Sequence, residues 1–167
     1  MEQLILGNIF DLVASLLLIY SGTLYERKKI LLVDMSRGFL SAFGRLILGS
    51  FTGFVSSTST FVRNFLYYKG KLSLRNKLIV GFLTVFFSLR FGDISFLSLI
   101  PTVISISYLF FFDMEKIKNF KLLNAFYAAL WLVYKIYIRS YLSAFVEILV
   151  AVTNLVAFKR YSCSEES

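Results

Sequence analysis

The chain has 167 residues, of which 57% are hydrophobic and 18% aromatic, and its mean hydropathy is +0.73. Its formal net charge is +8, and it contains one cysteine and no histidine. A soluble fold of this size needs more polar surface than this composition supplies, so we expect an integral membrane protein. The lack of histidine argues against a Ser-His-Asp triad, and the single cysteine against a zinc site or an intrachain disulfide. We therefore expect neither enzyme activity nor a metal or other cofactor.

Seven apolar stretches approach or reach the roughly 20 residues that a helix needs to cross a bilayer. They are Leu4–Leu24, Ile30–Ser50, Phe51–Tyr68, Asn76–Phe91, Ile94–Phe112, Phe120–Ile138 and Tyr141–Lys159. None shows the alternation of polar and apolar residues that is typical of barrel strands. The sequence therefore predicts an all-α integral membrane protein with seven transmembrane helices.

The second and third stretches are the most polar of the seven. The second contains Asp34, Arg37 and Arg45, and the third contains the hydroxyl run 56–60. Such residues are tolerated in a membrane where they face other helices or water, so both stretches belong inside a bundle.

The positions of lysine and arginine between the stretches predict the orientation, because cytoplasmic loops carry the excess of these residues. If the N-terminus is outside, twelve cations lie on the inner side, at positions 27, 28, 29, 69, 71, 75, 77, 116, 118, 121, 159 and 160. Only Arg90 and Arg139 lie on the outer side. We therefore expect the N-terminus outside, the C-terminus in the cytoplasm, and contact between the cations and lipid headgroups.

An internal repeat appears when the chain is shifted against itself by 90 residues. Nine positions are then identical, among them Ser50 with Ser140 and Asn64 with Asn154. The alignment pairs the first three spans with the last three, leaving the fourth as a linker. We expect a first three-helix bundle at 1–72, a linker helix at 73–92, a second bundle at 93–161 and a polar tail at 162–167.

This arrangement resembles the SWEET and PQ-loop (MtN3-like) superfamily, in which two parallel three-helix repeats flank a linker helix. An asparagine on the third helix of each repeat, Asn64 and Asn154, is part of the resemblance. The stretch Leu97–Ser105, followed by 131–140 and Glu147, is similar to the bacterial inner membrane proteins called YgjV. The resemblance covers most of the chain and implies a location in a bacterial inner membrane.

The resemblance also implies a solute pocket faced by the paired asparagines and a proline hinge on the first helix of each repeat. Pro101 supplies that hinge in the second repeat, whereas Asp11 occupies the equivalent position of the first. The third helix of YgjV-type proteins looks like Asn-x-x-Arg. Here Thr60 replaces the asparagine, while Arg63 is kept.

Charged residues within the spans need partners or a function, because each costs about 2.5 to 3.5 kcal/mol at a helix centre. Counting helical rise from the predicted ends places Asp11, Arg45, Lys135 and Glu147 in the outer half of the membrane. Each repeat then holds one acid and one base. We expect the ion pairs Asp11–Arg45 and Lys135–Glu147, which either tie helices together or form an outer gate whose partners exchange.

The inner half of the predicted bundle holds the candidate solute-binding residues, which are Asp34, Arg63, Asn64, Asn124 and Asn154. Asp34 and Arg63 lie at similar depth on adjacent helices and could pair. Amide side chains donate and accept hydrogen bonds, which suits hydroxyl-rich or zwitterionic solutes, while an unneutralised arginine favours an anion. The alternative is that these residues only form hydrogen bonds between helices.

Three aromatic residues, Trp131, Tyr134 and Tyr137, recur at a spacing of three near the outer end of the sixth span. Aromatic side chains at this depth usually anchor a helix at the membrane interface. Stacking on a solute is the alternative role.

Two functions fit the sequence. The first is a small-solute transporter in which the two repeats give alternating access to a central pocket. The alternative is a receptor or assembly partner on the same fold, since a fold does not dictate transport. The expected partners are membrane lipid, a small polar solute and, in a homo-oligomer, a second copy. We do not expect nucleic-acid binding, because no soluble module would carry it.

Overall fold

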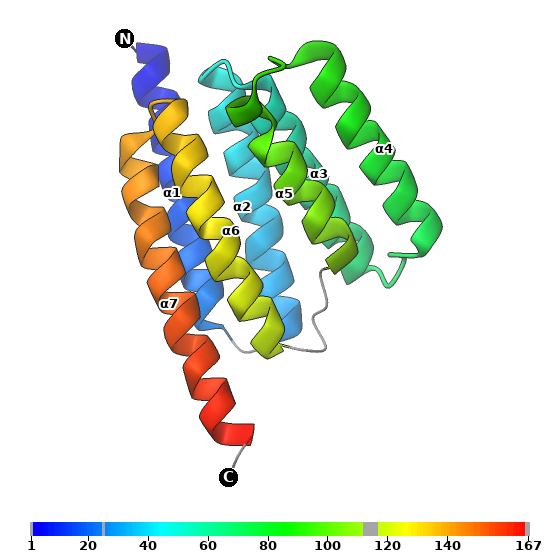
Figure 1. Cartoon of the computed structure of the whole chain (residues 1–167), viewed down its shortest axis with the longest axis vertical. Coiled ribbons are helices and arrows are strands. Elements are labelled where there is room, and N and C mark those ends of the chain that lie inside the picture. Colours follow the sequence, from blue (N-terminus) through cyan, green and yellow to red (C-terminus); the bar gives the residue numbers. More distant parts are fainter. Residues whose placement is uncertain (1, 25, 112–116, 166–167) are drawn as a thin grey trace.

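The computed structural model describes the backbone of residues 2–24, 26–111 and 117–165, and their side chains except those of 117–120 and 160–165. The described residues form seven helices: α1 (Glu2–Thr23), α2 (Arg27–Ile47), α3 (Phe51–Tyr68), α4 (Leu74–Phe91), α5 (Phe96–Phe111), α6 (Ile117–Tyr137) and α7 (Tyr141–Glu165). The helices run alternately up and down, so the two termini lie at opposite ends of the bundle (Figure 1). The all-helical class predicted from the sequence is confirmed.

The helix boundaries follow the predicted apolar stretches. α3 has the predicted bounds, whereas α7 continues to Glu165, so the predicted polar tail begins as helix. The predicted end of the fifth span at Phe112 and the cation Lys116 lie outside the described residues. Two helical segments, Glu2–Thr23 and Tyr141–Lys159, are individually long and apolar enough to cross a membrane.

Six of these helices form a closed ring. The order of neighbours is α1, α2, α3, α5, α6 and α7, and α7 completes the ring by packing on α1. α4 lies outside the ring, against α3 and α5 (Figure 1). The helices before α4 therefore meet those after it at two seams, α3–α5 and α1–α7.

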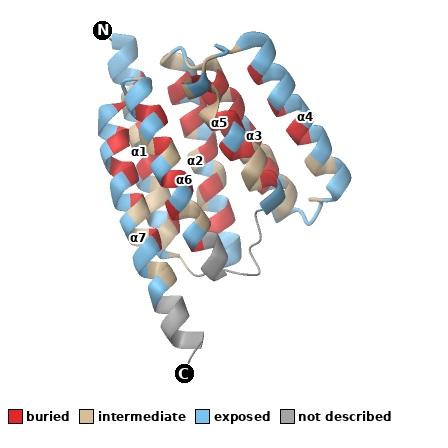
Figure 2. Ribbon diagram, in the orientation of Figure 1, coloured by how far each residue is buried: buried red, intermediate tan, exposed pale blue. Residues whose placement is uncertain are grey.

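The interior of the ring is polar and its outer surface is apolar. Most buried acids and bases face inward, and buried serines and threonines lie at helix contacts, while large side chains of the ring such as Leu16, Phe126 and Phe145 are more than half exposed (Figure 2). Hydrocarbon solvates apolar side chains but leaves polar groups unsatisfied. This distribution is the one that a bilayer favours.

The hydroxyl run of α3 packs at the contacts of this helix with α4 and α5. Ser56 donates a hydrogen bond of 2.8 Å to the carbonyl oxygen of Pro101, and its hydroxyl also bonds to that of Ser105. On the side of α4, the hydroxyl of Thr84 donates to that of Ser59 at 2.9 Å. The hydroxyl run thus joins three helices.

The turns that follow α2 and α6 have the same geometry, although 90 residues separate them. The backbone N–H of Ser50 donates to the carbonyl of Arg45 at 2.9 Å, and that of Ser140 donates to the carbonyl of Lys135 at 2.8 Å. The residue before each serine is left-handed, with φ of 75° at position 49 and 60° at position 139. Both turns are helix C-caps of the Schellman type. The sequence repeat therefore has a counterpart in the local backbone.

α1 and α2 approach closely because both carry glycine at their crossing. A Cβ atom added to Gly44 would lie 3.0 Å from the carbonyl oxygen of Gly7 and 3.0 Å from the backbone nitrogen of Asp11. A larger residue at either glycine would push the two helices apart. This crossing places the side chain of Asp11 within reach of α2.

Candidate functional site

Asp11 lies at the centre of a buried ion network. Its Oδ1 is 3.7 Å from Nε of Arg45, and its Oδ2 is 3.6 Å from Nζ of Lys135. Nζ of Lys135 is also 2.7 Å from Oε1 of Glu147. None of the four residues is more than 4% exposed. The structure brings together both of the pairs expected from the sequence and joins them through the contact between Asp11 and Lys135, which sequence reasoning missed.

Serine hydroxyls supply further hydrogen bonds to this network. Ser41 donates to Oδ1 of Asp11 at 3.3 Å, and Ser140 donates to Oδ2 at 3.0 Å. Lys135 donates from Nζ to the hydroxyl of Ser15 at 2.6 Å. Buried charges are tolerated where such bonds accompany the ion pairs. Asp11 on α1 is thus held by α2 on one side and by α6 and the start of α7 on the other.

Aromatic side chains cover Arg45. Its guanidinium carbon lies 4.0 Å from the ring centroid of Trp131, and Tyr134 packs edge-on against that ring. The hydroxyl of Tyr134 bonds to that of Ser50. Trp131 is 8% exposed and Tyr134 is fully buried, so their expected role as interface anchors is wrong. Only Tyr137, which is 43% exposed, lies on the outer surface, because α6 turns the other two toward Arg45.

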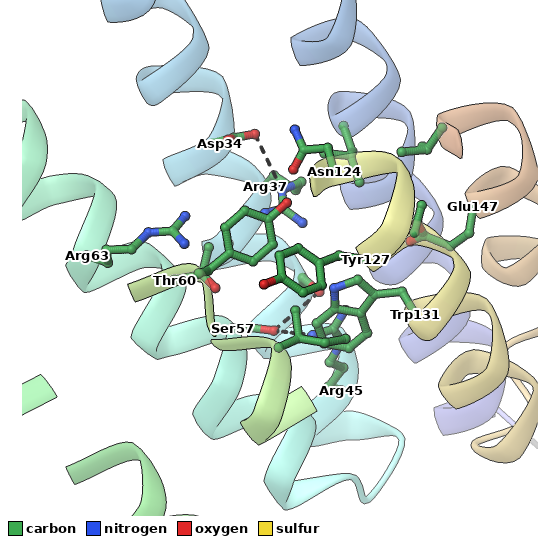
Figure 3. Close-up of a pocket in the computed structure, with 17 residues that line it drawn as sticks. Asp34, Arg37, Arg45, Ser57, Thr60, Arg63, Asn124, Tyr127, Trp131 and Glu147 are labelled. Carbon is green, nitrogen blue, oxygen red and sulfur yellow. Dashed lines mark hydrogen bonds and ion pairs between the residues drawn. The ribbon is translucent and has the colours of Figure 1, made fainter. Parts of the chain in front are cut away.

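A central cavity is lined by side chains from all six helices of the ring (Figure 3). Its charged and amide residues are Asp34, Arg37, Arg45, Arg63, Asn124 and Glu147. The cavity has a volume of about 30 Å³. This is room for about two water molecules. The charges predicted at two different depths of the membrane therefore share one small polar cavity.

The pairing in the α2–α3 half of this cavity differs from the prediction. Asp34 forms an ion pair with Arg37, one turn along α2, at 3.6 Å between Oδ1 and Nε. Arg63, the predicted partner of Asp34, donates two hydrogen bonds to Oδ1 of Asn64, at 3.0 Å from Nε and 2.7 Å from an Nη. Its guanidinium also stacks 4.9 Å from the ring centroid of Tyr108. Arg37 took no part in the predicted binding set, although its spacing of three from Asp34 was a usable signal.

The structure places Asn64 and Asn154 away from the cavity wall, which corrects the expectation that they face each other across it. Both are buried, but neither is among the lining residues. Asn64 follows the lining residue Arg63 and is therefore rotated by about 100° around α3. Asn154 donates from Nδ2 to the carbonyl of Val150 at 2.8 Å and lies beside Gly22 of α1. It thus lies at the α1–α7 seam.

Pro101 and Lys121, both singled out from the sequence, lie at contacts between helices. Pro101 is buried within α5 at the α3–α5 seam, where its role as a hinge stays a prediction. Lys121, counted above among the interfacial cations, is 1% exposed and donates from Nζ to the carbonyl oxygen of Gly22 at 2.7 Å. A cation at the C-terminal end of a helix is favourable, because the last carbonyls lack helical partners.

A second, larger cavity opens at the end of the bundle where the chain begins. Its space is about 300 Å³, and it lies between the turns α2–α3, α4–α5 and α6–α7. Its polar lining includes Ser50, Asp93, Tyr134 and Arg139. Because Tyr134 also packs on Trp131, which lines the central cavity, these two rings separate the two spaces. We call this larger cavity the vestibule.

The match to known proteins extends over nearly the whole chain. The model of a family named Imp-YgjV and described as "Bacterial inner membrane protein" matches residues 5–165. The chain belongs to the Imp-YgjV family. Its predicted location in a bacterial inner membrane is thereby confirmed. No curated protein and no solved structure matches the chain significantly.

The central cavity of this Imp-YgjV protein carries charged and amide side chains. In the described part of the chain, no group of three His, Cys, Asp or Glu residues could hold a metal ion. Asp11, Asp34 and Glu147 each lie within ion-pair distance of a cation. The cavity therefore offers charged donors and acceptors to a solute in a water-poor environment, where such bonds are strong.

Proposed function

We propose that this Imp-YgjV protein is a small-solute transporter that works by alternating access between two SWEET-like repeats, α1–α3 and α5–α7, with α4 as the linker. The observation that carries the proposal is the central cavity, to which all six ring helices contribute. Parallel repeats related by an axis along the membrane normal are a known transporter architecture, with the solute site between the repeats.

The two cavities support a path for the solute. The vestibule holds about 300 Å³ of open space and the central cavity only about 30 Å³. Between them lie Tyr134, bonded to Ser50, and Trp131, stacked on Arg45. In this interpretation the conformation is closed on the vestibule side, and separation of Tyr134 from Ser50 opens the way to the central cavity.

The ion network supports movement between the repeats. Asp11 has partners in both halves of the chain, Arg45 at 3.7 Å and Lys135 at 3.6 Å. A carboxylate shared in this way can stay with one cation while the other moves off, so the charge is never left unpaired during a change of state. This is the gate role suggested by the sequence, with Asp11 as the shared group.

The test is flux through the reconstituted protein, with and without a plug in the cavity. Thr60 lines the cavity, whereas Thr58 on the same helix is exposed on the outer surface. We expect proteoliposomes to accumulate at least one solute from a panel of labelled sugars, amino acids and organic acids. We expect Thr60→Trp to abolish that uptake and the matched variant Thr58→Trp to retain it.

Two outcomes would contradict the transporter. If no solute crosses the membrane while one of them stabilises the purified protein, the receptor function replaces it. If uptake survives Thr60→Trp unchanged, the solute does not pass through the central cavity.

A further inference from the structure

Buried polar atoms without a hydrogen-bond partner collect in the central cavity. Among the described residues seven side-chain atoms are of this kind, and four belong to charged residues that line the cavity. These are Oδ1 of Asp34, Nε of Arg37, Nε of Arg45 and Oε2 of Glu147. A buried atom of a charged group that lacks a hydrogen-bond partner is unfavourable, so this cavity favours a polar occupant.

The four atoms are balanced between donors and acceptors. Two guanidinium N–H groups can donate, and two carboxylate oxygens can accept. A simple anion would satisfy the arginines but would face the carboxylates of Asp34 and Glu147, and a simple cation would meet the reverse problem. A solute that carries both charges satisfies donors and acceptors together.

The spacing on α2 favours one pair as the site for both charges. Asp34 and Arg37 are three residues apart, so their Cα atoms differ by about 4.5 Å along the helix axis. Oδ1 and Nε lie 3.6 Å apart, which is an ion pair but too long for a hydrogen bond, and both atoms remain without a hydrogen-bond partner. A group with an ammonium and a carboxylate could replace this loose pair by two charge-assisted hydrogen bonds, which are shorter and stronger.

We propose that the transported solute is a small zwitterion, an amino acid, whose ammonium binds Asp34 and whose carboxylate binds Arg37. The inference rests on the proposed function, because the same cavity serves both. The other two atoms without a hydrogen-bond partner are Nε of Arg45, which is ion-paired with Asp11 at 3.7 Å, and Oε2 of Glu147. They lie further along the path and receive the solute as it moves toward the vestibule. The closed cavity has room for only about two water molecules and must widen to hold any amino acid, so the smallest ones, glycine, alanine and serine, are the probes.

The first experiment measures the unfolding midpoint of the purified full-length protein in detergent with glycine, alanine or serine. The comparison is an equimolar mixture of acetate and methylammonium, which supplies the two charges on separate molecules. We expect at least one amino acid to raise the midpoint by several degrees at millimolar concentration and the mixture to leave it unchanged. Equal effects of the mixture and the amino acids, or no effect of any amino acid, would overturn the proposal.

The variants Asp34→Asn and Arg37→Gln test the assignment of each charge. We expect each to weaken amino-acid binding at least tenfold, and Glu26→Gln, at an exposed acid that lines neither cavity, to leave it unchanged. Without the carboxylate of Asp34 the site no longer requires an ammonium group. Acetate and alanine should therefore bind the Asp34→Asn variant with similar affinity. This change of specificity separates a binding role from a defect in folding. Unchanged preference for alanine over acetate in a folded Asp34→Asn protein would overturn the assignment.

Uptake into proteoliposomes separates this proposal from the proposed function. If acetate or glycerol enters but no amino acid does, the protein is a transporter and the zwitterion is wrong. If alanine binds with the expected specificity but nothing enters, the site stands and the transporter is wrong. Saturable uptake of an amino acid that is lost in Arg37→Gln would support both.

Discussion

At the scale of single residues, Asp11 determines how the charges of the two halves are connected. It is the only acid in the described structure that lies within ion-pair distance of two buried cations, Arg45 and Lys135. Lys135 has a second carboxylate in Glu147, whereas the other partners of Arg45 are a serine hydroxyl, a backbone carbonyl and an aromatic face, none of them charged. Removal of the Asp11 charge therefore affects Arg45 most.

We predict that Asp11→Asn lowers the free energy of unfolding by about 3 to 5 kcal/mol, because it leaves a cation buried without its partner. The measurement is the unfolding midpoint in detergent. Glu26→Gln is the matched control, since it breaks an ion pair with Lys29, 2.8 Å long, whose side chains are 66% and 60% exposed. Exposed pairs contribute little, so no shift is expected there. Similar midpoints for the two variants would show that Asp11 is not part of a stabilising network.

A second prediction concerns exchange of charges within a pair. We predict that the double variant Asp11→Arg/Arg45→Asp does not recover the wild-type midpoint, because the arginine introduced at position 11 would face Lys135. The exchange Lys135→Glu/Glu147→Lys should fail for the matching reason, since a glutamate at position 135 would face Asp11. Recovery of the midpoint in both double variants would mean that the two pairs are independent.

The sequence predicts the depth of each residue along its own helix, but not how the helices lie relative to one another, so only part of this site could be predicted. Counting residues along each span places Asp11 and Arg45 at the same depth, and the structure pairs them. The same count placed Asp34 level with Arg63, whereas the structure pairs Asp34 with Arg37. The contact of Asp11 with Lys135 depends on how α6 lies relative to α1, which no count along one helix supplies. Asn64 shows the same limit, because a rotation of about 100° separates it from the lining position of Arg63.

At the scale of elements, the matched turns after α2 and α6 differ in the residue that adopts positive φ. Gly49 has φ of 75° and Arg139 has φ of 60°. Glycine adopts this region freely, whereas other residues lose about 1 to 2 kcal/mol there. The positive φ of Arg139 therefore destabilises the second turn, whereas glycine avoids this loss in the first turn.

We predict that Arg139→Gly raises the free energy of unfolding by about 1 kcal/mol and that Gly49→Ala lowers it by a similar amount. A Cβ atom at position 49 would meet no atom within 4 Å, so the loss would come from the backbone alone. Both are measured as shifts of the unfolding midpoint. Shifts of the same sign in the two variants would show that backbone conformation does not control stability at these turns.

Element boundaries were accessible from the sequence because they depend on the length of apolar runs and on local signals. Ser50 and Ser140 directly precede α3 and α7, and the hydroxyl of Ser50 accepts a hydrogen bond from the backbone N–H of Gly53, as N-cap serines usually do. The order of helices around the ring was not accessible in this way. It depends on close approaches such as that of Gly44 to α1, which are properties of two surfaces together.

At the scale of the whole molecule, the fold is a ring whose polar atoms face inward. Composition and apolar run length are sufficient to predict a helical membrane protein, since the bilayer permits few other structures. A central pocket is implied by the resemblance, but its actual lining could not be predicted, because it needs six helices to be rotated correctly at once. The presence of Asp34, Arg37, Arg45, Arg63 and Glu147 in one cavity is a result of those rotations.

The last prediction is the orientation of this ring in the membrane, which follows from the twelve cations expected on one side and the two on the other. We predict that a membrane-impermeant maleimide labels Cys163, the single cysteine, in inverted inner-membrane vesicles but not in spheroplasts. The control is Asp93→Cys in a Cys163→Ser background, because Asp93 is exposed at the vestibule, at the opposite end of the bundle. It should be labelled in spheroplasts only. The reverse labelling pattern in both proteins would show that the vestibule faces the cytoplasm. The Tyr134–Ser50 contact would then be an inner gate. The ring and its cavity would then still admit a solute, but the closed side of this conformation would be the cytoplasmic one.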